Sequence, residues 1–137
     1  MASTKPVFKD VQEPRNLRGL SLATTESVLA TQSSVTIDAG SDGVRHVADS
    51  FSFSVAPNGG AVLAASTVRV SIIDGASAAT SYLWSDVLHI NSNGAESISY
   101  FNMGLTGTAA TALTIEFDGA VTGAWTSLNL GYFDVGP

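Results

Sequence analysis

The chain has 137 residues, the size of one ordinary domain, and no cysteine, which excludes disulfides, thiolate metal sites and cysteine nucleophiles. Only 13% of its residues are charged, and the formal net charge is −6. An acidic chain repels phosphate, so nucleic acid is not expected as a partner. No stretch approaches the roughly 20 apolar residues that span a bilayer, so no membrane partner is expected either. The N-terminus mixes charges with prolines where a signal peptide needs an apolar run, which predicts a soluble protein without a secretory signal.

Positive charge is concentrated at the N-terminal end of the chain. Residues 1–18 carry four basic and two acidic side chains, whereas residues 19–137 carry two basic and ten acidic ones. Pro6 and Pro14 interrupt any helix or central strand in the first segment. We therefore expect residues 1–25 to form an extended N-terminal arm.

The predicted arm has an attractive partner in any acidic surface, its own or a neighbour's. We expect it to dock on a sister subunit or on another protein. A disordered tail and a first edge strand of the chain's own fold are the alternatives for the same segment. The residues expected to make the docking contacts are Lys5, Val7, Phe8, Lys9, Val11, Arg15 and Arg18.

From Val35 onward the chain has the pattern of short strands separated by turns. In Ser50–Val55, SFSFSV, two phenylalanines and a valine alternate with three serines, so one face is expected in a core and the other in water. Similar segments follow at Thr67–Ile73, Tyr82–Asn91, Glu96–Met103, Leu113–Phe117 and Ser127–Val135. Thr114 and Glu116 fall on the polar face of their strand, whereas the aromatic-rich segment Glu96–Met103 could be covered on both sides.

Turn signals separate these segments. Asx-Gly pairs tolerate the left-handed backbone that reversing chain requires, and Gly75–Ser81, although Ala-rich, is short enough to be a loop. Seven or eight strands of this length predict an all-β fold for residues 26–137, an antiparallel β-sandwich with a jelly roll as the favoured variant. The pattern does not determine the strand order. The pairs are Asp42-Gly43, Asp74-Gly75, Asn93-Gly94 and Asp118-Gly119.

Candidate catalytic and metal-binding groups are sparse. His46 and His89 lack partners at metal-ligand spacing, and we expect His46 to flank a strand and His89 to lie on a wet strand face. The loop 38–43 lacks the ligand pattern of a calcium-binding EF-hand. Glu116 and Asp118 share a strand face but are better explained as an exposed acidic pair than as the carboxylates of a glycosidase. We therefore expect no enzyme activity, no metal and no cofactor.

The aromatic residues suggest a different function. Flat rings can stack on sugars, and β-sandwiches commonly carry carbohydrate-binding modules, although the spacing does not place these rings on one surface. A core or interface position is the alternative for the two tryptophans. The aromatic residues considered are Tyr82, Trp84, Tyr100, Trp125 and Tyr132.

The basic N-terminal segment, the acidic body without lysine, the regular short strands and the missing cysteines together resemble the capsid decoration (cement) proteins of tailed bacteriophages. The resemblance concerns composition and layout over the whole chain. It implies a non-enzymatic protein made in the host cytoplasm that binds the assembled capsid surface of the virion and stabilises it. Its implied partners are the major capsid protein or another virion protein and sister copies, with a trimer as the favoured homo-oligomer. The alternative function is a carbohydrate- or receptor-binding module of a viral fibre or spike.

Overall fold

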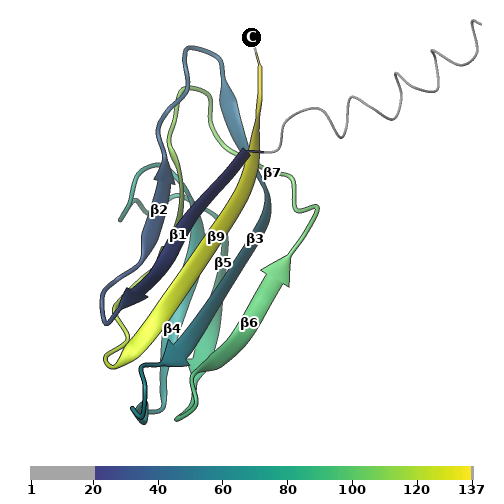
Figure 1. Cartoon of the computed structure of the whole chain (residues 1–137). Helices are drawn as coiled ribbons and strands as arrows, with labels where there is room; N and C mark the ends of the chain where they lie inside the picture. Colours follow the sequence, from purple (N-terminus) through teal and green to yellow (C-terminus); the bar gives the residue numbers. More distant parts are fainter. Residues whose placement is uncertain (1–20, 137) are drawn as a thin grey trace, which may run out of the picture.

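The structure is a computed structural model, and it describes residues 21–136. These residues form nine strands in two antiparallel sheets (Figure 1). The strands are β1 (Ser21–Leu29), β2 (Ser34–Ile37), β3 (Arg45–Pro57), β4 (Ser66–Asp74), β5 (Tyr82–Ile90), β6 (Ala95–Tyr100), β7 (Leu105–Thr106), β8 (Leu113–Phe117) and β9 (Ala124–Val135). No helix in this part of the chain is long and apolar enough to cross a membrane.

The two sheets have nested strand pairs. Sheet A has the order β1-β9-β3-β6, with the short β7 also on β3, and sheet B has the order β2-β8-β4-β5. In sequence order, the pairs enclose one another. The first strand pairs with the last (β1 with β9) and the second with the last but one (β2 with β8), and the pairs β3·β6 and β4·β5 lie between these in the sequence. This nesting is the double Greek key of a jelly roll. The predicted β-sandwich and its favoured variant are therefore confirmed.

The core lies between the two sheets. Phe51, Phe53 and Val55 of β3 are each no more than 3% exposed, as the alternation in SFSFSV predicts. Sheet B contributes the opposing layer, with Ile72, Ile115 and other side chains fully buried. A period of two thus places one row of each strand in the core and leaves the other row for the outer faces of the sandwich.

The expected domain boundary falls inside a strand. Residues 21–25, assigned from the sequence to the arm, belong to β1, whose register runs from Ser21 opposite Tyr132 to Leu29 opposite Trp125. Figure 1 shows β1 and the end of β9 side by side. β1 has no run of alternating apolar residues, so the sequence pattern does not show it. β2 has the short alternation of Val35 and Ile37, which is where the regular pattern begins.

Two predictions about strand faces are wrong. Thr114 and Glu116, expected on a wet face, are both buried, because the Gly75–Ser81 loop packs over β8. Ser97 and Ser99 of β6 and the adjacent Phe101 are exposed, so this segment is not covered on both sides. The predicted loop at Gly75–Ser81 is present. Turns lie at Asp42-Gly43 and at Asn93-Gly94, whereas the chain only bends at Gly75, directly after β4, and at Asp118-Gly119.

Candidate functional site

The docking residues expected from the sequence lie outside the described residues. Lys5, Val7, Phe8, Lys9, Val11, Arg15 and Arg18 all precede Ser21, and the arm stays a prediction. The surfaces of the sandwich itself are the other place where a partner could bind.

The outer side of sheet A carries regular rows of uncharged side chains on its two central strands, β3 and β9. Side chains at alternate positions of β3 and β9 point away from the core, and the register sets them opposite one another. On the neighbouring strand β1, Leu22 and Leu29 lie on the same side of the sheet, and Phe101 follows β6 on the opposite flank. We call this surface the open face; its residues are Leu22, Leu29, Ser50, Ser52, Ser54, Ala56, Ser99, Phe101, Trp125, Ser127, Asn129 and Gly131.

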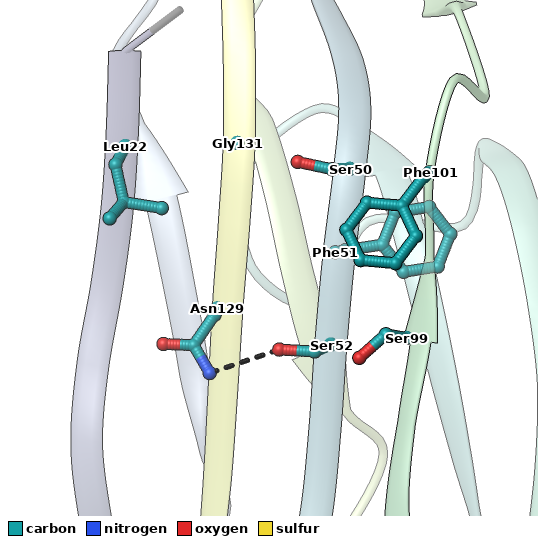
Figure 2. Close-up of a pocket in the computed structure, with 8 residues that line it drawn as sticks. All are labelled: Leu22, Ser50, Phe51, Ser52, Ser99, Phe101, Asn129 and Gly131. Atoms are coloured by element: carbon teal, nitrogen blue, oxygen red, sulfur yellow. Dashed lines mark hydrogen bonds between the residues drawn. The ribbon is translucent and has the colours of Figure 1, made fainter.

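A depression of about 150 Å³ lies at one end of the open face (Figure 2). Gly131 is opposite both Leu22 of β1 and Ser50 of β3. Because glycine adds no side chain there, the surface is low between Leu22 on one side and Phe101 on the other. Leu22 is 70% exposed and Phe101 is 71% exposed, so both apolar walls are available to a ligand.

The floor of the depression is polar and neutral. Figure 2 shows Ser50, Ser52 and Ser99 with their hydroxyl groups on this side of the sheet, and the Asn129 amide nitrogen donates to the Ser52 hydroxyl at 3.1 Å. Hydroxyl and amide groups each both donate and accept hydrogen bonds. The depression therefore offers two apolar walls above a floor that can satisfy a ligand's hydroxyl groups.

The other end of the open face carries Trp125. Its side chain is 37% exposed, and Leu29 and Ala56 lie opposite it on the neighbouring strands. The indole Nε1 donates to the Oδ1 atom of Asn58 at 3.0 Å. That bond holds the ring at the start of β9, between β1 and β3. The interface position considered for this tryptophan stays a prediction.

The outer side of sheet B has the opposite character. Glu116 of β8 is 5% exposed, and its carboxylate accepts hydrogen bonds from the Ser77 hydroxyl and from the backbone N–H of Ala78, the latter at 3.2 Å. Thr114 donates to the Gly75 carbonyl at 2.8 Å. We call this surface, defined by Thr114, Glu116 and the loop 75–81, the covered face. Glu116 is not half of an exposed acidic pair, and its partners are structural.

His46 is also used structurally. It lies in β3, 4% exposed, with Nδ1 2.5 Å from Asp134 Oδ1 and Nε2 2.7 Å from the Asp38 carbonyl oxygen. It thereby ties the loop before β3 to the end of β9. His89 is exposed on β5, as predicted. Within residues 21–136, no group of three or more His, Cys, Asp or Glu residues could hold a metal ion.

Trp84 and Tyr100 are partly buried and belong to an aromatic cluster that packs against the core. The Tyr100 ring stacks on Phe51, with centroids 5.1 Å apart, and Trp84 contacts both rings. Burial raises the pKa of Tyr100 above its usual value, and the negative charge of Asp86 and the hydrogen bond to it act in the same direction. This cluster joins the edges of the two sheets through β5 and β6.

Sequence reasoning missed Phe101 and Leu22. Phe101 continues the exposed series Ser97, Ser99 by the period of two, and that signal could have placed it on a wet face. Leu22 lies in the segment that the sequence predicts as an arm, with a first edge strand as the alternative, and no alternation of apolar residues there indicates which face of a sheet it would occupy. That Leu22 and Phe101 flank the same depression depends on the strand order β1-β9-β3-β6, which the sequence pattern does not determine.

Comparison with known proteins identifies the family. The Cleaved Adhesin Domain family matches residues 22–126, which is most of the chain and spans β1 to the first residues of β9. A comparison with curated proteins finds no match. On the strength of the family match over this length, the chain belongs to the Cleaved Adhesin Domain family.

Proposed function

We propose that this protein is a non-enzymatic binding module that attaches to carbohydrate through the open face. The observation that carries the proposal is the exposed Phe101 ring beside the neutral polar floor of Ser50, Ser52, Ser99 and Asn129. The family match supports an adhesive role, because the matched family is named for adhesin domains.

The side-chain chemistry suits a sugar. A sugar ring has an apolar C–H face and a rim of hydroxyl groups, so it can stack on an aromatic side chain while exchanging hydrogen bonds with serine and asparagine. Isolated exposed apolar residues are common, but two of them flanking one depression on a chain with few charges favour a contact surface. The depression is shallow, so we expect weak binding by one copy and strong binding only when several copies act together.

Capsid decoration is a separate proposal. It depends on the basic residues between Lys5 and Arg18, on an acidic body and on the resemblance in composition. Its test is co-sedimentation of the full chain, and of a variant lacking residues 1–20, with assembled capsids. Loss of sedimentation in the shortened variant is the expected result, and equal sedimentation of both would exclude docking by the arm.

The carbohydrate proposal is tested on an array of neutral and acidic glycans with the full chain displayed in many copies. We expect binding to neutral glycans, and we expect Phe101→Ala to reduce it about tenfold or more. Val87→Ala is the matched control, because Val87 is also an exposed apolar residue but lies on β5 of sheet B. Equal binding by Phe101→Ala and the unmodified protein would contradict the proposal.

A further inference from the structure

Two apolar contact points lie on the open face, one at each end. Leu22, Gly131 and Phe101 define the first, at the depression. Trp125 and Leu29 define the second, and the register places them directly opposite each other on β9 and β1. Because Gly131 and Trp125 are six positions apart on the same strand, the two points are separated by about 20 Å at roughly 3.3 Å per residue.

A polar track connects the two points. Asn129 lies opposite Ser52, and Ser127 lies opposite Ser54, so two rows of hydroxyl and amide groups cross β3 and β9 between the apolar ends. None of these side chains is charged, although the chain as a whole has a net charge of −6. The net negative charge of the protein disfavours an anionic ligand, and the neutral track offers a cationic ligand no carboxylate to pair with, so an uncharged ligand fits it best.

The orientation of the Trp125 side chain is fixed by a hydrogen bond within the protein. Its indole donates to Asn58, so the ring orientation is already set before a ligand arrives. A side chain that is fixed in advance loses less conformational entropy on binding. The second contact point therefore adds affinity without the cost of ordering a free ring.

We infer that the open face binds an unbranched neutral polysaccharide that lies along β3 and β9 and contacts both Phe101 and Trp125. This inference rests on the proposed carbohydrate function and adds the ligand's charge, its length and its direction on the sheet. A ligand that ends at the depression would use Phe101 alone, whereas a chain along the strands also reaches Trp125.

The test measures affinity against ligand length by titration calorimetry. The probes are unbranched neutral β-1,4-linked and α-1,4-linked glucose and mannose oligomers, from the disaccharide to the octasaccharide. We expect Phe101→Ala to weaken binding at every length. Trp125→Ala should weaken only the long oligomers, by about tenfold, and Trp125→Phe should restore most of that loss because it keeps a ring. Val87→Ala, with unchanged affinity, is the control, and thermal unfolding shows that each variant is folded.

The outcomes separate this inference from the function on which it rests. If Phe101→Ala weakens binding and Trp125→Ala changes nothing at any length, the site is short, so the inference is wrong and the carbohydrate function stands. If neither variant affects glycan binding, or no neutral oligomer binds, both are wrong. If the unmodified protein self-associates without glycan and Phe101→Ala abolishes the association, the open face is an interface between copies, which also overturns the inference.

Discussion

The outer sides of the two sheets differ in how far their side chains are covered by other parts of the chain. On sheet B, the loop 75–81 closes over β8, and its Ser77 hydroxyl and Ala78 N–H satisfy the buried Glu116 carboxylate. On sheet A, Phe101 and Leu22 remain more than two-thirds exposed over neutral polar neighbours. Polar side chains on sheet B are thus closed over by a loop and bonded to it, whereas the open face of sheet A has no such loop among the described residues.

The largest stability effect is expected on the covered face. Glu116→Ala removes the acceptor of two hydrogen bonds and leaves the Ser77 hydroxyl and the Ala78 N–H without their partner. We expect the free energy of unfolding to fall by about 2 to 4 kcal/mol, measured by urea denaturation. Glu96→Ala, at an exposed glutamate of β6, should change it by less than about 0.5 kcal/mol. Equal effects of the two changes would break the contrast between the faces.

A smaller loss in the free energy of unfolding is expected where His46 links the end of β9 to the loop before β3. His46→Ala removes the contacts to the Asp134 carboxylate and to the Asp38 carbonyl and leaves a buried space. We expect a loss of about 1 to 3 kcal/mol in the free energy of unfolding. His89→Ala is the matched control at an exposed histidine and should be near neutral. A near-neutral His46→Ala would show that the described contacts do not hold this edge together.

Substitutions on the open face should leave stability almost unchanged. The double change Leu22→Ala and Phe101→Ala removes two side chains that are mostly in water. We expect the unfolding free energy to change by no more than about 0.5 kcal/mol in the denaturation experiment, even where glycan binding is lost. A loss as large as that of Glu116→Ala would mean that these side chains belong to the fold and not to a binding surface.

The smallest effect concerns Tyr100, between the edges of the two sheets. Since its pKa is raised in the folded protein, the folded state favours the neutral phenol, and this contribution is complete below about pH 10. It is lost as the pH rises through the raised pKa. Tyr100→Phe should therefore make stability less dependent on pH above pH 10, measured by thermal unfolding between neutral and alkaline pH. Tyr132→Phe is the control, and identical alkaline profiles for Tyr100→Phe and the unmodified protein would contradict the account.

The sequence predicts the fold better than the site. Alternation in Ser50–Val55 and in Leu128, Leu130 and Tyr132 is a local signal, because a period of two needs only neighbouring residues to be read. The burial of Glu116 depends on a loop some 40 positions earlier in the chain, and no local pattern shows it. The open face likewise depends on β1, β9, β3 and β6 becoming neighbours, and single-sequence periodicity does not determine that order.

The most direct test of the central claim is a ¹H–¹⁵N NMR titration of the full chain with the neutral oligosaccharide that binds best in the length series. We expect the amide shifts of Ser50, Ser52, Ser99, Phe101 and Asn129 to change, while those of the loop 75–81 do not. Shift changes centred on the loop 75–81 and β8, with the open face unperturbed, would contradict the central claim.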